Sequence, residues 1–119
     1  MKKDNILQDK SYNFALRIIK TYQYLCSKKN EYVLSKQLLR SGTSIGANIE
    51  EAIGGQSEKD FFAKISVSYK EAREAHYWTR LLRDSRYLTE KQAKSLLAQN
   101  EELLKIMGSI QKTLKLRMK

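Results

Sequence analysis

The sequence predicts an all-α protein, an antiparallel up-down-up-down bundle of four helices in a single domain covering residues 1–119. There is no proline, so the commonest helix breaker is missing. Four of the five glycines lie between Gly42 and Gly55, which leaves long uninterrupted segments elsewhere. Apolar residues recur with the helical period along those segments, and short polar stretches separate them. Long helices joined by short connections are typical of an antiparallel bundle.

The first helix is expected at about residues 9–27, with Asp9 or Ser11 capping its start. Residues 27–31 are polar and interrupt the pattern, so we place the first connection there. The apolar stripe repeats every three or four residues and consists of Phe14, Ala15, Ile18, Ile19, Tyr22, Leu25 and Cys26.

The second helix, at about 32–53, contains the segment SGTSIGANIEEAIGG, which is rich in small residues. A phosphate-binding loop needs GxxxxGK[ST] or GxGxxG after a buried strand, and neither pattern is present. The helical period instead passes through the segment in register. Gly42 and Gly46 share one helix face. Because each costs roughly 1 kcal/mol relative to alanine, we expect a neighbouring helix to pack closely there. Gly54 and Gly55 are predicted to end the helix in the left-handed conformation.

The third and fourth helices are expected at about 58–84 and 89–116. Each follows a capping-box pattern, SEKD starting at Ser57 and TEKQ starting at Thr89. Apolar residues cover more than one face of the third helix, which predicts a central place in the bundle or burial against another subunit. These residues are Phe61, Phe62, Ile65, Val67, Tyr69, Ala72, Ala75, Tyr77, Trp78, Leu81 and Leu82.

The charge balance indicates an anionic partner. Twenty-three Lys and Arg face thirteen Asp and Glu, a formal net charge of +10. Such an excess attracts nucleic acid or an acidic protein. The lone cysteine, Cys26, cannot form an internal disulfide, which favours a cytoplasmic location and a role as a small buried apolar residue. We expect neither a signal peptide nor a membrane span, because no apolar run is long enough.

The sequence does not favour catalysis, and we predict no enzyme activity, no cofactor, no metal and no small-molecule substrate. The lone histidine, His76, is wrongly spaced from Glu74 for a bundle metal site. Glu71 and Glu74 share a helix face and could act as general acid and base. The favoured interpretation is that they pair with cations across a subunit contact or hydrogen-bond Asn48. Asn48 and Glu51 are likewise predicted to form a polar network that fixes helix register.

Basic residues supply the candidates for nucleic-acid binding. Arg73, Tyr77 and Arg80 follow helical spacing on one face of the third helix, near His76 and Tyr69. Interleaved Tyr and Arg can stack bases and bind phosphates. The alternative is an oligomer contact in which arginine stems cover the tyrosines. A second candidate group has no acidic residue between its members and comprises Lys105, Lys112, Lys115, Arg117 and Lys119.

Two segments carry a family resemblance. SGTSIGANIEEA and SEKDFFAKISVSYKEAREAHYWTRLL resemble the bacterial four helix bundle protein family, which includes proteins encoded in intervening sequences of 23S rRNA genes. The accessory variability proteins of diversity-generating retroelements look like more distant relatives. The matching residues are Ser44, Ile45, Ala47, Asn48, Ile49, Glu51, Phe61, Lys64, Ser66, Glu71, Ala72, Glu74, Tyr77, Trp78 and Leu81.

The resemblance implies a left-handed four-helix bundle that assembles into a ring-shaped homopentamer and catalyses no reaction. Gly42, Gly46 and Trp78 are then expected at helix-packing or oligomer contacts. In the retroelement branch, the resemblance implies a basic scaffold that binds nucleic acid and a reverse transcriptase. We therefore expect a basic oligomeric scaffold that binds RNA or DNA through charge and shape. The alternative is an adaptor for an acidic protein, such as a reverse transcriptase or another nucleic-acid enzyme.

Overall fold

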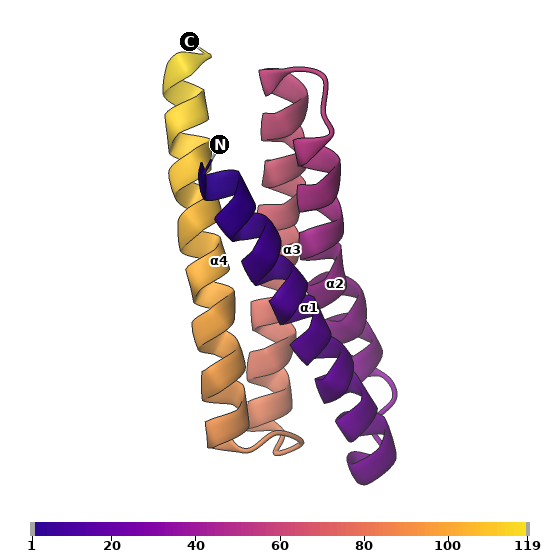
Figure 1. Cartoon of the computed structure of the whole chain (residues 1–119). Helices are drawn as coiled ribbons and strands as arrows, with labels where there is room; N and C mark the ends of the chain where they lie inside the picture. Colours follow the sequence, from indigo (N-terminus) through magenta and orange to yellow (C-terminus); the bar gives the residue numbers. More distant parts are fainter. Residues whose placement is uncertain (1, 119) are drawn as a thin grey trace.

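The computed structural model describes the backbone of residues 2–118 and the side chains of residues 6–118. These residues form α1 (Lys2–Lys29), α2 (Leu34–Ile53), α3 (Glu58–Asp84) and α4 (Glu90–Arg117), joined by short connections. Successive helices run in opposite directions along a rod of 48 × 21 × 21 Å (Figure 1). Contacts form between α1 and α2, α2 and α3, α3 and α4, and α4 and α1. The described part of the chain thus confirms the predicted all-α, four-helix fold and is consistent with an up-and-down bundle.

The first helix is longer than the sequence predicted, because it begins at Lys2 and not near Asp9. Ser11 does not cap it. Its hydroxyl lies inside the helix and donates a hydrogen bond to the carbonyl of Gln8 (3.1 Å). The apolar stripe continues upstream from Phe14, past the buried Ser11, to the buried Leu7. Because the polar Ser11 interrupts the apolar stripe, the sequence analysis missed the first two turns of the helix.

The helix ends combine predicted and unexpected caps. Thr89 forms a complete capping box with Gln92 at the start of α4, as predicted. Ser57 caps α3 by accepting the N–H of Asp60 (3.1 Å). The prediction of left-handed glycines after α2 was wrong: Gly54 has φ −82°, and its N–H continues the helical pattern by bonding the Glu50 carbonyl.

The start of α2 is capped by a carboxylate that the sequence analysis did not single out. Glu31 is buried, and its two oxygens accept the backbone N–H groups of Val33 (3.2 Å), Leu34 (3.0 Å) and Ser35 (2.6 Å). Burial alone would raise the pKa of Glu31, but these hydrogen bonds outweigh it and lower the pKa below its ordinary value. The carboxylate therefore satisfies the free donors of the first helical turn.

The core lies along the bundle axis, and α1 is placed unevenly around it. The contacts of α1 with α2 are more extensive than those with α4. Figure 1 shows α1 crossing obliquely and diverging from α4 toward the Lys29 end. Gly42 permits the close approach to α2, because a Cβ atom there would be 2.7 Å from Ile18 Cγ1. At Gly46 α1 also lies in contact but less closely, since a Cβ there would meet Ser11 Oγ at an ordinary van der Waals distance of 3.5 Å.

The core contains one amide with unusual surroundings. Asn100 lies on the buried stripe of α4 and is 1% exposed. Neither its Oδ1 nor its Nδ2 has a hydrogen-bond partner among the described residues. A buried amide without hydrogen-bond partners lowers the free energy of unfolding. Asn100 therefore lowers the stability of the fold compared with an apolar residue of similar size.

Candidate nucleic-acid interface

A basic hollow of about 250 Å³ lies between α3 and α4. Arg73, His76 and Arg80 line it from α3, and Leu104 lines it from α4. The three α3 residues are three and four positions apart, so they project from one side of the helix. The structure therefore brings Arg73 and Arg80, both predicted as binding residues, to the same depression.

Aromatic and cationic groups meet at the rim of this hollow. Tyr77 is 47% exposed, and the Arg80 guanidinium lies 5.7 Å from the centre of its ring. The Trp78 ring packs edge-on against Tyr77, with centroids 5.1 Å apart. His76 Nε2 lies 2.8 Å from Glu101 Oε2 of α4. Tyr77 thus exposes a ring face beside the Arg80 guanidinium, and interleaved Tyr and Arg residues can stack bases and bind phosphates.

The cations continue along the seam between α3 and α4. Gln111 of α4 donates a hydrogen bond to Ser66 of α3 (3.2 Å), and Glu101 pairs with His76, so both positions mark the α3-facing side of α4. Helical periodicity places Lys105 and Lys112 on that same side, and both are exposed. Periodicity also places Lys70 of α3 on the same face as Arg73. The cations of this seam, which we name the α3–α4 basic face, are Lys70, Arg73, Arg80, Lys105 and Lys112.

The cations near the C-terminus differ from one another in their ion pairing, which the sequence did not suggest. Lys115 is exposed in the last turns of α4. Arg117 instead forms an ion pair with Glu58, at the start of α3. Lys119 lies outside the described residues. Because the fold brings Glu58 to this end of α4, the tail has an acidic neighbour that is distant in sequence.

The paired glutamates form a cluster with a cation that sequence reasoning missed. Arg40 of α2 donates Nη1 to Glu71 Oε2 (3.2 Å) and Nη2 to Glu74 Oε1. Trp78 Nε1 donates to the same Glu74 oxygen (3.3 Å). The hydrogen bond to Glu74 raises the pKa of Arg40 above its ordinary value. The two carboxylates thus pair with a cation of their own chain and link α2 to α3.

Asn48 and Glu51 do not form the predicted shared network. Asn48 Nδ2 donates to the carbonyl of Ser44, one turn back in its own helix (2.8 Å). Glu51 is exposed and pairs with Lys64 of α3 (2.8 Å). The two side chains lie three residues apart yet bond to different elements, because Glu51 extends to α3 and Asn48 folds back onto α2.

Two further features of the described residues bear on function. Residues 6–118 contain no cluster of three or more His, Cys, Asp or Glu side chains able to hold a metal ion. Within the described chain, no helix combines the length and apolar character that crossing a bilayer demands.

The comparisons with known proteins identify the class and then the family. By its fold, the chain is an all-α protein of four helices with a basic face. Residues 3–109 match the family of 23S rRNA-intervening sequence proteins, and the chain belongs to that family. A comparison with curated proteins found no match.

A solved structure agrees with this assignment. The chain is similar to a protein of unknown function from the S23 ribosomal protein family of Bacteroides thetaiotaomicron. The two are 47% identical and superpose with a TM-score of 0.91, over 92% of this chain and 98% of that one. The resemblance drawn from the two sequence segments is thereby confirmed, and the family has no established activity.

Proposed function

We propose that this protein is a basic, non-enzymatic scaffold of the cytoplasm that binds RNA or DNA through its α3–α4 basic face. The observation that carries the proposal is the hollow in which Arg73 and Arg80 flank His76, with the exposed Tyr77 beside it. Phosphate groups bind to the arginines, and the tyrosine ring stacks against a base or sugar. Lys105 and Lys112 extend the positive surface along the rod.

The mode of binding follows from the type of contact. Arginine and lysine contacts to phosphates fix position and orientation without reading sequence. Each neutralised phosphate releases a counterion, so affinity falls steeply as salt rises. The net charge of +10 adds a long-range attraction that salt also screens. We therefore expect binding by charge and shape, with little base preference.

The test compares two double variants of equal charge. Arg73→Gln with Arg80→Gln removes two cations of the basic face, and Lys29→Gln with Lys36→Gln removes two exposed cations of α1 and α2. Fluorescence anisotropy with generic RNA, between about 50 and 200 mM salt, should show a much larger loss for the first pair and a shallower salt slope. Equal losses would refute this face as the binding site, and absence of binding at low salt would refute the function.

An acidic protein is the competing partner and is an outcome of the same assay. A polyglutamate competitor should displace RNA only weakly, because it lacks the aromatic bases that stack on Tyr77. Displacement at concentrations equal to those of competing RNA would favour the adaptor function. The arginines of the hollow would then bind carboxylates. Arginine forms bidentate hydrogen bonds with carboxylates as well as with phosphates.

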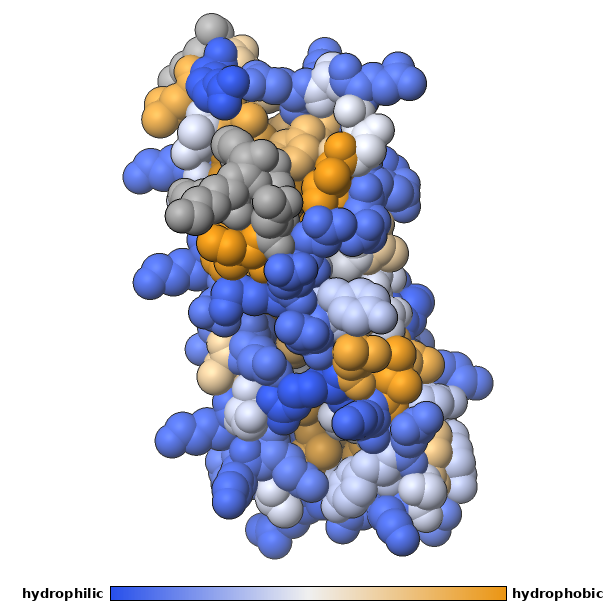
Figure 2. Space-filling model, viewed as in Figure 1, coloured by the Kyte–Doolittle hydropathy of each residue, from blue (hydrophilic) through white to orange (hydrophobic). Residues whose placement is uncertain are grey.

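We further propose that five copies of the chain associate into a ring. Each subunit is then a left-handed four-helix bundle. Helices α1 and α3 occupy opposite corners of the bundle, because each packs on α2 and α4. Both expose apolar side chains, including Tyr12 (64%) and Leu16 (46%) on α1 and Val67 (43%) on α3. Orange apolar patches interrupt the hydrophilic surface on the side that α1 covers (Figure 2).

Two different apolar faces on opposite sides support a head-to-tail contact, which forms a ring when the rotation between successive subunits closes. The number five follows the family resemblance. If every chain carries +10, five chains carry a formal +50, and the basic faces repeat around the ring. Light scattering should then give a mass of about 70 kDa, five times 13.9 kDa.

A matched pair of variants tests the contact. Leu16→Glu places a charge on the exposed α1 face and should shift the mass toward the monomer while helicity is retained. Leu116→Glu makes the same change at an exposed leucine near the end of α4 and should leave the mass unchanged. A monomeric wild-type protein at micromolar concentration would contradict the ring.

A further inference from the structure

A second groove lies on the other side of α4, where α1 diverges from it. Near the N-terminal half of α1 the seam is bridged by side chains. Lys10 pairs with Glu102 (3.2 Å), and Arg17 Nη1 donates to Ser95 Oγ (2.9 Å) and Gln99 Oε1 (2.6 Å). Beyond Arg17 no described side chain of α1 bonds to α4 in this way, and the two helices separate (Figure 1). A groove of about 280 Å³ opens there.

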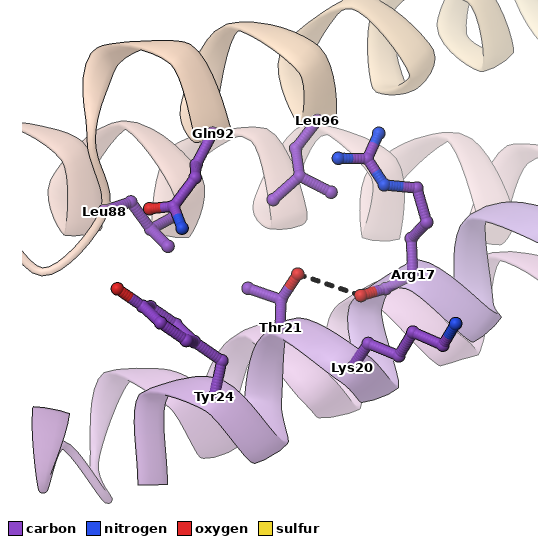
Figure 3. A pocket seen from close by; sticks show the side chains of 7 residues that line it. All are labelled: Arg17, Lys20, Thr21, Tyr24, Leu88, Gln92 and Leu96. Carbon is purple, nitrogen blue, oxygen red and sulfur yellow. Dashed lines mark hydrogen bonds between the residues drawn. The ribbon is translucent and has the colours of Figure 1, made fainter. Parts of the chain in front are cut away.

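The groove has an apolar floor, an aromatic wall and a cationic end. Figure 3 shows Leu88 and Leu96 on the α4 side, the Tyr24 ring at one end, and Arg17 with Lys20 toward the other. Thr21 lies between them on α1, and its hydroxyl donates to the Arg17 carbonyl (2.8 Å). The groove thus places a flat aromatic ring and two cations within one depression.

The polar groups of the groove are held in defined positions. Gln92 Oε1 accepts the backbone N–H of Thr89 (2.9 Å), so the amide nitrogen is the end left to donate. In Figure 3 that nitrogen points toward the groove. Neither Arg17 nor Lys20 pairs with a carboxylate of residues 6–118, although Arg17 is held by two neutral acceptors. An anionic ligand would therefore meet cations that no described acid neutralises.

We propose that this groove holds one unstacked nucleotide of a single-stranded nucleic acid, with its base against Tyr24 and its phosphate at Arg17 and Lys20. The apolar floor and the ring accommodate a planar base, and the Gln92 amide can donate to an acceptor on the base edge. An apolar helix in this place would bury two unpaired cations, which is costly. This inference rests on the proposed nucleic-acid function and adds a preference for single strands.

Crosslinking locates the bound base directly. A single-stranded RNA of about 12 nucleotides carrying 5-iodouridine is irradiated with the full-length protein, and the crosslinked peptide is identified by mass spectrometry. The expected product joins the uridine to Tyr24. Crosslinks confined to Tyr77 on the α3–α4 basic face would overturn the proposal and leave the proposed function standing.

Affinity measurements test the aromatic contact. Tyr24→Leu keeps an apolar side chain but removes the ring, and it should weaken single-stranded RNA binding by roughly tenfold, the size expected for loss of one base–aromatic stack. Binding to an RNA duplex should change less than about twofold, because duplex bases remain stacked. Tyr24→Phe keeps the ring and should bind the single strand as wild type. Equal losses for single strand and duplex would overturn the proposal.

The cationic end is tested separately. Arg17→Gln with Lys20→Gln should weaken single-stranded binding more than the control pair Lys29→Gln with Lys36→Gln, which removes the same charge. If the wild type binds RNA and none of the groove variants changes the affinity, the groove is not the binding site, and the proposed function still stands. If wild type binds no RNA at low salt, the proposed function fails with it. Polyglutamate bound at the groove as tightly as RNA would identify an acidic peptide site instead.

Discussion

The Cα of Gly42 faces Ile18 so closely that a Cβ atom at residue 42 would lie 2.7 Å from Ile18 Cγ1 and 2.8 Å from Ile18 Cγ2. Contacts this short do not occur between real carbon atoms, so any larger residue at position 42 must displace α1 or the branched Ile18 side chain. The close packing of α1 on α2 therefore requires glycine at position 42, because glycine has only a hydrogen atom where other residues have a side chain.

Gly42→Ala should lower the free energy of unfolding by about 1–3 kcal/mol through overpacking, despite the better helix propensity of alanine. Gly46→Ala should instead raise it by up to about 1 kcal/mol, because the added methyl meets Ser11 at an ordinary 3.5 Å. Urea denaturation measures both. In an Ile18→Ala background, Gly42→Ala should become neutral or stabilising. A persistent loss there would show that Ile18 is not the obstacle.

The cap at Glu31 should make α2 sensitive to acid. The lowered pKa means that the ionised carboxylate stabilises the folded state above the unfolded-state pKa, and this stabilisation is lost as pH falls through the folded pKa. Glu31→Gln should cost about 1–2 kcal/mol at neutral pH. Thermal unfolding measured across acidic pH should show the difference between variant and wild type shrinking as pH falls. A constant difference would contradict the role of the charge.

Asn100 offers a simple route to a more stable protein. Asn100→Leu removes an amide with no described partner and fills similar space, so it should raise the free energy of unfolding by about 1–3 kcal/mol. Chemical denaturation at neutral pH measures this change. Asn100→Asp provides the opposite control, since a buried unpaired carboxylate should destabilise strongly. Loss of stability in the leucine variant would mean that the amide is satisfied in solution, for example by a buried water.

The connection after α3 contains a residue in a disfavoured conformation. Arg86 has φ 69°, and the N–H of Tyr87 bonds the Leu82 carbonyl (2.9 Å), a helix ending in which glycine is usual. Arg86→Gly should stabilise the fold by about 0.5–1 kcal/mol, because glycine adopts this conformation without strain. Arg86→Ala keeps the Cβ and should give no gain in thermal unfolding. An equal gain from alanine would assign the effect to the lost charge.

The bounds of the helices could be predicted where apolar period and cap agree. SEKD and the stripe after it indicated 58–84, and α3 spans Glu58–Asp84. The start of α1 was missed because Ser11 interrupts the stripe before Leu7. The cap at Glu31 was missed because glutamate is not among the preferred N-cap residues.

The candidate site was predictable only within single helices. Helical spacing brought Arg73, Tyr77 and Arg80 together, since one helix determines their positions. The partners Arg40, for Glu71 and Glu74, and Glu58, for Arg117, come from other helices and need the three-dimensional packing. The α1–α4 groove was missed for the same reason, because it depends on the tilt of α1 and leaves no local pattern in the sequence.

The uneven packing of α1 also has a consequence for the order in which the chain folds. Helices α2 and α3 are neighbours in sequence and share the most extensive contacts of any pair, whereas the contacts between α1 and α4 are few and join segments from opposite halves of the chain. Closing a long loop costs more chain entropy than closing a short one. The α2–α3 hairpin is therefore expected to form the nucleus, and the α1–α4 seam is expected to close last and open first.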